Sequence, residues 1–309
     1  MVGLVRWVTV GAAALALAVP GSAAARPLFG FNDSAASFEE HAGYAATDAQ
    51  IARLPVSWEL TEPTRGAYDF SELDPAVSAL EARGVRVLFV ISAAPAWAAT
   101  GCVPDAPDST CSVGRGHEGA YQQLALALLG RYPGSKIQAW NEPNIPEFGE
   151  LHPKRAAQLT NALYAVAPGK IIGPAASPGD ARHLPYTRRM YRHINRHVPL
   201  AVNFYPRSVV AQRSIGTDWG FTRDIAGHRR IWVTEIGFAS SEFGDRGQAA
   251  KAVMAYRFLD QHGAHAVIFH RLVDVPVAGS PWLSSLGLID ADGQPKPAFT
   301  ALTNAVQRG

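Results

Sequence analysis

Two glutamates stand out in this sequence because each follows an apolar run. Glu142 ends the stretch KIQAWNE at residues 136–142, and Glu235 lies near the end of RIWVTEIG at residues 230–237. Runs of this kind are typical of buried strands, so we expect each carboxylate at a strand end. Paired carboxylates can exchange protons with a substrate when they converge on one point. The question is which fold would bring the two glutamates together.

Eight apolar, β-rich runs recur along the chain with helical stretches between them. The runs lie at residues 28–31, 49–56, 85–92, 136–140, 170–175, 200–205, 230–237 and 266–271, and the expected helices include 71–83, 115–131, 154–167, 187–197, 246–263 and 297–307. The strands are almost continuously apolar, as in a parallel sheet that is buried on both faces. This alternation predicts an α/β fold, a single-domain (β/α)8 TIM barrel.

A doubly wound open sheet is the competing fold. It should carry a glycine-rich phosphate turn after its first strand, and the stretch LFGFNDSAAS at residues 28–37 contains no G-x-G-x-x-G. In a barrel, the carboxyl ends of all strands meet at one face, where active sites are built. Glu142 would close the fourth strand and Glu235 the seventh. These two strands face each other across the barrel, so the two carboxylates can converge.

The residues next to Glu142 allow two predictions about the backbone there. Pro143 disfavours the helical conformation for the residue before it, so we expect Glu142 to be held extended at the strand end. Asn141 and Glu142 are neighbours, and successive side chains of a regular strand point to opposite faces. If both residues serve the site, the strand must be irregular there, for example through a bulge.

The first 25 residues predict a secretory signal peptide. Arg6 is their only charge, an apolar run covers residues 8–19, and helix breakers and small residues follow up to Ala25. An uncleaved anchor is the alternative, but the breakers and small residues leave too short a core to span a membrane comfortably. We therefore expect cleavage near Ala25, a secreted protein without stable membrane association, and a catalytic domain at residues 26–309.

The composition limits the possible partners. Without Arg6, the chain has 27 basic and 26 acidic side chains, and this balance argues against a nucleic-acid partner. In an exported chain, Cys102 and Cys111, which flank a loop rich in Pro, Asp and Ser, favour a disulfide bond. A metal site would need nearby histidines, and His117 is the only one close by. We expect a monomer without a metal or an organic cofactor.

Several stretches resemble the clan A retaining glycoside hydrolases, a (β/α)8 group that includes cellulases, β-mannanases and β-xylosidases. AWNEPN at residues 139–144 and WVTEIGF at 232–238 resemble the acid/base and nucleophile strands. ARLPVSWELTEPTRGAYDFSELD at 52–74 is similar to the second-strand region, where the clan places an arginine near the nucleophile, and Arg53 matches it. LGLIDADGQPKPAFTAL at 286–302 resembles the final turn and helix.

The resemblance implies a glycosidase that cleaves β-linked polysaccharides or oligosaccharides by double displacement. Glu142 would be the general acid and base, and Glu235 the nucleophile, because the reaction needs one protonated and one ionised carboxyl group. Arg53 would keep Glu235 ionised by its positive charge. Asn141 would bind the sugar 2-hydroxyl, and Tyr205 matches the tyrosine that the clan sets beside its nucleophile.

Two positions depart from the pattern of the clan. Many members carry a histidine where this chain has Asn203, and a tryptophan platform where this chain has His270. Both positions remain substrate-binding candidates, but the identity of the sugar stays open. Trp97 and Trp282 follow the third and eighth strands, where they can stack on sugar rings or pack at the rim.

The alternatives lie within and outside the enzyme class. Endo action competes with exo action of a β-xylosidase type, and transglycosylation competes with hydrolysis, since a sugar hydroxyl can replace water in the second step. The absence of an appended β-rich domain favours endo action. A non-catalytic carbohydrate-binding barrel would lack one catalytic carboxylate, whereas Glu142 and Glu235 are both present.

Overall fold

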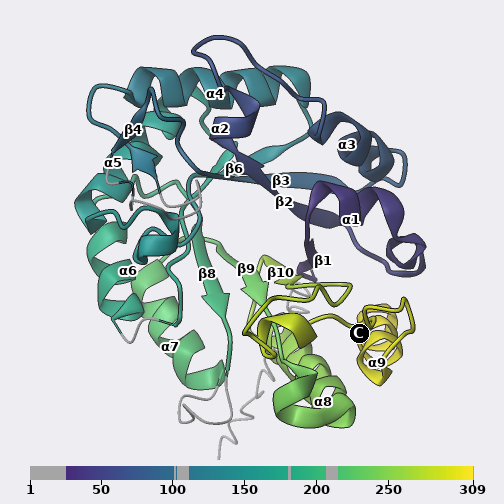
Figure 1. The fold of residues 1–309 in the computed structure, drawn as a ribbon. Coiled ribbons are helices and arrows are strands. Elements are labelled where there is room, and N and C mark those ends of the chain that lie inside the picture. The colour runs from purple at the N-terminus through teal and green to yellow at the C-terminus, as the bar shows by residue number, and fades with distance from the viewer. Residues whose placement is uncertain (1–25, 101, 103–110, 180–181, 207–214, 309) are drawn as a thin grey trace, which may run out of the picture.

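The computed structural model describes residues 26–100, 102, 111–179, 182–206 and 215–308, and within them eight parallel strands wrap into a nearly closed barrel (Figure 1). Their hydrogen-bonded order is β7, β6, β3, β2, β1, β10, β9, β8. The strands are β1 (Leu28–Asn32), β2 (Ile51–Ser57), β3 (Arg86–Ser92), β6 (Lys136–Gln138), β7 (Ile171–Ile172), β8 (Leu200–Phe204), β9 (Ile231–Ile236) and β10 (Ala266–Phe269). The predicted (β/α)8 fold is therefore confirmed.

Helices surround the barrel on its outside (Figure 1). They are α1 (Ala35–Glu40), α2 (Trp58–Thr61), α3 (Leu73–Glu81), α4 (Glu118–Arg131), α5 (Pro153–Val166), α6 (His183–Tyr191), α7 (Ile215–Ala226), α8 (Ser240–Gln261) and α9 (Pro297–Arg308), with short 3-10 turns at η1 (Ala42–Ala46), η3 (Pro146–Phe148) and η4 (Leu283–Ser285). None of the helices in the described part of the chain combines the length and the apolar character needed to cross a membrane.

Two helices differ from the sequence-based expectation. The helix predicted at 187–197 is present with other bounds: α6 begins at His183 and ends at Tyr191, and turns follow it. Within the turns that follow α6, Asn195 accepts from the backbone N–H of His197 at 3.0 Å, a local contact that competes with helical hydrogen bonding at that point. Helix α7 is not among the expected helices, and its two glycines and two threonines give it a low helix propensity.

The inside of the barrel has an apolar floor beneath a polar layer. The floor is a separate cluster of Ile51, Leu88, Ile172, Ala175, Ala201, Trp232, Ala266 and Ile268. Side chains two residues apart on a strand point to the same side, so Arg53, Asn203 and His270 lie directly above Ile51, Ala201 and Ile268. The sequence thus changes from apolar to polar at the carboxyl ends of the strands, where barrel enzymes keep their sites.

Tyr191 bridges the two end strands of the sheet, β7 and β8. Its hydroxyl accepts from the backbone N–H of Ala201 at 2.9 Å and donates to the carbonyl of Pro174 at 3.2 Å. Beside it, the Gly173 N–H donates to the carbonyl of Pro199 at 3.1 Å. A Cβ at Gly173 would lie 2.2 Å from the Tyr191 hydroxyl, so only glycine leaves room for this side chain.

Tyr191→Phe is expected to lower the free energy of unfolding by about 1–3 kcal/mol, because it leaves a buried donor and a buried acceptor unpaired. Urea unfolding followed by circular dichroism would measure the change. Tyr164→Phe is the matched control, since the Tyr164 hydroxyl makes no hydrogen bond within the described residues. Equal effects of the two substitutions would mean that the Tyr191 hydroxyl does not hold the barrel closed.

The loop after β3 contains the expected disulfide. Cys102 and Cys111 are bonded, with their Cα atoms 4.2 Å apart. The bond lies next to a short antiparallel pair, β4 (Ala99–Thr100) and β5 (Ser112–Val113). The disulfide therefore ties together the two arms of this excursion, and residues 103–110 between the cysteines lie outside the described residues.

Candidate active site

The backbone leaves regular strand geometry before it reaches Glu142. Strand β6 ends at Gln138, Asn141 pairs with Ala175 in an isolated bridge, and Glu142 has a φ of 33°. The expectation that Pro143 holds Glu142 extended is therefore wrong. A non-glycine residue with positive φ costs of order 1–3 kcal/mol and clusters at functional sites. This turn resolves the problem of neighbouring side chains, because Asn141 and Glu142 need not point to opposite faces.

A β-bulge lies in β9, the strand that carries Glu235. Val202 pairs with Val233 and Asn203 pairs with Glu235, so Thr234 is an extra residue relative to β8. The hydroxyl of Thr234 donates to Asn203 Oδ1 at 2.9 Å, while Glu235 contacts Arg53. Two successive side chains thus reach polar groups inside the barrel, which a regular strand does not allow. The irregularity that the sequence suggests at Asn141 and Glu142 is a turn, and the bulge lies here instead.

Glu235 is buried and hydrogen-bonded through both carboxylate oxygens. Arg53 donates to Oε1 at 2.6 Å, and the Tyr205 hydroxyl donates to Oε2 at 2.5 Å. Burial alone would raise the pKa of Glu235, but the positive charge of Arg53 and the hydrogen bonds from Tyr205 and Arg53 outweigh it. The pKa therefore lies below its ordinary value, and the carboxylate is ionised at neutral pH.

Arg53, on β2, connects its own strand to the carboxyl ends of three others, β1, β6 and β9. Besides Glu235, its guanidinium donates to Gln138 Oε1, Asn32 Oδ1 and Asn141 Oδ1, each at 2.7 Å. The side chain is 1% exposed, and a guanidinium can only donate hydrogen bonds, so it needs this many acceptors when buried. Asn32 and Gln138 are not singled out by the sequence. Their only signal is a polar residue inside or directly after an apolar run.

Glu142 lies in a different electrostatic environment. Its Oε1 accepts from Asn203 Nδ2 at 3.0 Å, and Ser177 also hydrogen-bonds the carboxylate. Burial and then the negative charge of Glu235 raise the pKa of Glu142 to about 7, against the opposing effects of these hydrogen bonds and of Arg53. A substantial fraction of Glu142 is therefore protonated at neutral pH. Two carboxyl groups whose pKa values are pushed apart are suited to opposite roles in acid–base chemistry.

Asn203→Ala is expected to move the alkaline limb of the pH profile of kcat/KM to higher pH. The Asn203 amide stabilises the ionised form of Glu142, so its removal raises the pKa and keeps the acid protonated further up the pH scale. Asn304→Ala on α9 is a distant control. A limb that stays in place, or moves to lower pH, would contradict this picture of Glu142.

Aromatic side chains stand beside Glu235. The Tyr205 ring has Trp282 edge-on at 5.2 Å and His270 edge-on at 6.2 Å between centroids. Trp97 lies elsewhere: its indole N–H donates to the carbonyl of Glu62 at 3.1 Å, and its ring packs against Trp58 at 5.7 Å. The structure thus brings Trp282 and His270 to the nucleophile candidate, whereas the contacts of Trp97 within the described residues are with the rim.

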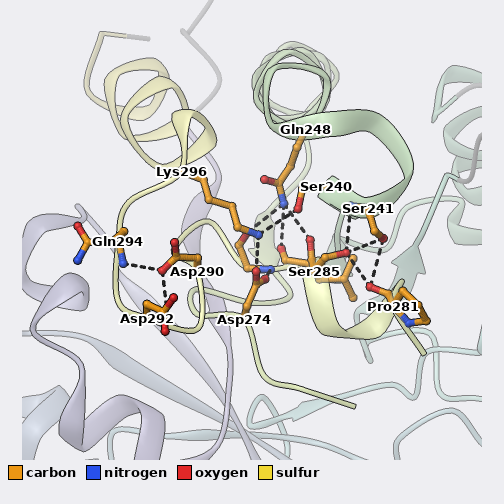
Figure 2. Close-up of polar contacts among 12 residues, drawn as sticks. Ser240, Ser241, Gln248, Asp274, Pro281, Ser285, Asp290, Asp292, Gln294 and Lys296 are labelled. Carbon is orange, nitrogen blue, oxygen red and sulfur yellow. Dashed lines mark hydrogen bonds and ion pairs between the residues drawn. The ribbon is translucent and has the colours of Figure 1, made fainter. Parts of the chain in front are cut away.

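A polar network holds the segment that carries Trp282 (Figure 2). This segment, residues 271–296, follows β10 and lies against the start of α8. Gln248 donates to the carbonyls of Phe238 and Gly287 at 2.9 Å each, and Lys296 pairs with Asp274 at 2.5 Å, with both side chains of that pair nearly buried. Phe238 lies three residues after Glu235. The network therefore fixes the Trp282 segment relative to the nucleophile strand.

In the part of the chain that the structure describes, no group of three or more His, Cys, Asp or Glu side chains is arranged to hold a metal ion. The polar layer instead consists of two carboxylates, one arginine and several amides. This set can bind a neutral polar substrate and exchange protons with it.

The chain is similar to known glycoside hydrolases in part of its sequence and in its fold. The model of glycoside hydrolase family 42, described as beta-galactosidase, matches residues 44–127, which contain Arg53 but neither glutamate. No curated protein matches the chain. Solved structures match it over 90–92% of its length, among them a family 39 glycoside hydrolase, a GH5_18 protein and a xylanase.

Three of these structures define the likeness. A family 39 glycoside hydrolase from Bacteroides cellulosilyticus WH2 has a TM-score of 0.70 and 22% identity, covering 92% of this chain and 64% of its own. A GH5_18 protein from Streptomyces cattleya, in complex with GlcNAc, has a TM-score of 0.67 and 20% identity, covering 92% and 80%. Xylanase B from Clostridium stercorarium F9 has a TM-score of 0.65 and 14% identity, covering 90% and 97%.

The fold is therefore the (β/α)8 barrel that these glycoside hydrolases share, and the resemblance inferred from the sequence is confirmed at the level of the fold. The first of these structures is longer, and this chain spans 64% of it. At identities of 14–22%, the likeness identifies the architecture, and the activity is argued from the site.

Proposed function

We propose that the protein is a retaining glycoside hydrolase that cleaves β-glycosidic bonds in a polysaccharide or oligosaccharide. The observation that carries the proposal is the pair Glu142 and Glu235, which share one polar site and have pKa values shifted in opposite directions. Glycoside hydrolysis needs one acid and one ionised carboxylate, and this pair offers both at neutral pH.

In the first step, Glu235 attacks the anomeric carbon while Glu142 gives its proton to the leaving oxygen. Arg53 and Tyr205 hold the two oxygens of Glu235 in place and keep the carboxylate ionised until it attacks. In the second step, Glu142 takes a proton from water, and the resulting hydroxide releases the sugar from Glu235 with its original configuration.

The remaining candidates bind the sugar. Asn141 accepts from Arg53 through Oδ1, which orients its Nδ2 group as a donor for the 2-hydroxyl. Asn203 holds Glu142 and takes part in the same polar layer. Trp282 stacks on a sugar ring beside Tyr205, and Trp97 serves a more distant sugar unit if the substrate is long.

The decisive test is a screen of purified protein on plant, fungal and bacterial glycans, followed by proton NMR of the first product. We expect release of a β-configured sugar from a β-linked substrate. An α-configured first product, or no turnover of any glycan, would overturn the proposal. Product analysis at high substrate concentration separates hydrolysis from transglycosylation, and product length separates endo from exo action.

We further propose that the protein is exported and cleaved near Ala25, on the basis of the charge and apolar pattern of residues 1–25. The mature chain is expected to begin near Arg26 and to be monomeric. N-terminal sequencing of material from the culture medium would test the cleavage. An intact Met1 recovered in the membrane fraction would contradict it.

A further inference from the structure

His270 and Asn32 form a short contact next to the proposed nucleophile. Asn32 ends β1, and His270 follows β10, the neighbouring strand in the barrel. The Asn32 Nδ2 atom lies 2.6 Å from His270 Nδ1, and Asn32 is 4% exposed. The contact therefore joins two neighbouring strand ends beside Glu235.

The orientation of the Asn32 amide follows from Arg53. Asn32 Oδ1 lies 2.7 Å from Arg53 Nη1, and a guanidinium has no acceptor, so the amide oxygen must face it. The amide NH₂ group then faces His270. Since this group can only donate, Nδ1 of the imidazole must be the acceptor and carry no proton. The neutral ring therefore carries its proton on Nε2.

The other protonation states of His270 conflict with this network. A proton on Nδ1 would set two donors against each other at 2.6 Å, and turning the amide would set its NH₂ against Arg53. The charges around the ring have opposing effects on the pKa of His270. Glu235 and Asp33 raise it by favouring the imidazolium, and Arg271 and Arg53 lower it. Burial is the largest influence, and the net result is a pKa of His270 below its ordinary value.

The Nε2–H group points away from Asn32 and has no hydrogen-bond partner among the described residues. The two ring nitrogens flank Cε1 and their in-plane directions diverge, so Nε2 is directed away from the buried amide when Nδ1 faces it. The ring stands edge-on to Tyr205, whose hydroxyl donates to Glu235. The side chain is only partly buried, although Nδ1 contacts the buried Asn32. The imidazole thus lies beside the tyrosine that hydrogen-bonds the nucleophile, with Nε2 facing away from the buried amide.

We propose that Arg53 and Asn32 fix His270 as an Nε2–H donor to a hydroxyl oxygen of the sugar bound at Glu235. The inference rests on the proposed glycosidase function and specifies its substrate class. The substrates are β-glycosides with a free hydroxyl at the ring position beside His270, and analogues that lack this hydroxyl are rejected. His270 contacts the sugar, whereas Asn32 is a positioning residue that acts through His270.

The tautomer can be tested on the free enzyme by nitrogen NMR with labelled histidine. The His270 signals, assigned by their loss in His270→Gln, are expected to show a protonated Nε2 and a bare Nδ1. Asn32→Asp places an acceptor against Nδ1 and should move a proton there, while the signals of the exposed His197 stay unchanged. A protonated Nδ1 in the parent protein would overturn the proposal, whether or not the enzyme has been shown to cleave a glycoside.

The recognition can be tested with aryl β-glycosides of the preferred sugar in which each ring hydroxyl in turn is replaced by hydrogen. Among positions other than the 2-hydroxyl, one deoxy analogue is expected to lose about tenfold or more in kcat/KM with the parent enzyme. That loss should vanish in His270→Phe and persist in His197→Phe. If removing each hydroxyl lowers kcat/KM by the same factor in the parent enzyme and in His270→Phe, His270 does not bind a hydroxyl. Lack of turnover of all glycosides by the parent would instead reject the proposed function itself.

Discussion

Replacing Glu235 is expected to lower kcat/KM for every glycoside by a factor of about 10⁴ or more, because no other group can form the covalent intermediate. Both Glu235→Gln and Glu235→Ala remove the counter-charge of the buried Arg53, but Glu235→Ala also removes the acceptor of its hydrogen bond and can destabilise the fold by about 3–5 kcal/mol, so Glu235→Gln is the better variant. The amide keeps the shape of the side chain: its oxygen can accept from Arg53, and its NH₂ group can donate to the Tyr205 hydroxyl, which can also act as an acceptor. Initial rates with an aryl β-glycoside, alongside thermal unfolding, would separate lost chemistry from lost stability.

Glu147→Gln provides the matched control for Glu235→Gln. Glu147 lies in η3, five residues after Glu142, and is exposed. The control should keep the activity of the parent. Small external nucleophiles add a second criterion: azide with Glu235→Ala should enter from the face that Glu235 has vacated and give the inverted α-glycosyl azide. Activity of Glu235→Gln within tenfold of the parent, or a β-azide from Glu235→Ala, would show that Glu235 is not the nucleophile.

The strand ends explain how much of this site can be predicted from sequence. Apolar runs identify buried strands, and a charged residue that ends such a run must face either water or a site. This reasoning predicts that Glu142 and Glu235 lie at the same end of the barrel. The structure places both in one polar layer, with Arg53 bonded to Glu235 and its field acting on Glu142.

The supporting residues are not predictable in the same way. Asn32, Gln138, Thr234 and Ser177 acquire their roles from contacts between distant parts of the chain. Gln138 is 85 positions from Arg53, and Asn32 is 238 positions from His270. A single polar residue in an apolar run does not reveal such a partner.

Local backbone geometry is equally hidden. Pro143 correctly argues against a right-handed helical Glu142, but the remaining choice between extended and left-handed backbone depends on tertiary contacts. The positive φ of Glu142 and the bulge at Thr234 are both irregular features, and each brings neighbouring side chains into one layer. Local propensity rules are expected to fail at such functional positions.

The Glu142→Ala variant is expected to behave differently from the Glu235 variants, because Glu142 acts on protons and not on carbon. With a leaving group as good as dinitrophenolate, no acid is needed, so formation of the glycosyl-enzyme should be nearly as fast as in the parent. Its hydrolysis should be slower by about 10²–10⁴, since the base is gone. A burst of dinitrophenol followed by a slow steady state is therefore the expected time course.

External azide should restore the turnover of Glu142→Ala, because azide needs no general base to attack the glycosyl-enzyme. It would enter from the face that water normally uses, so the adduct should be a β-glycosyl azide. The pH profile gives an independent check: the alkaline limb of the parent, set by Glu142 with a pKa of about 7, should vanish in the variant. Rescue by azide to an α-adduct, or a limb that persists near pH 7, would mean that another residue is the acid.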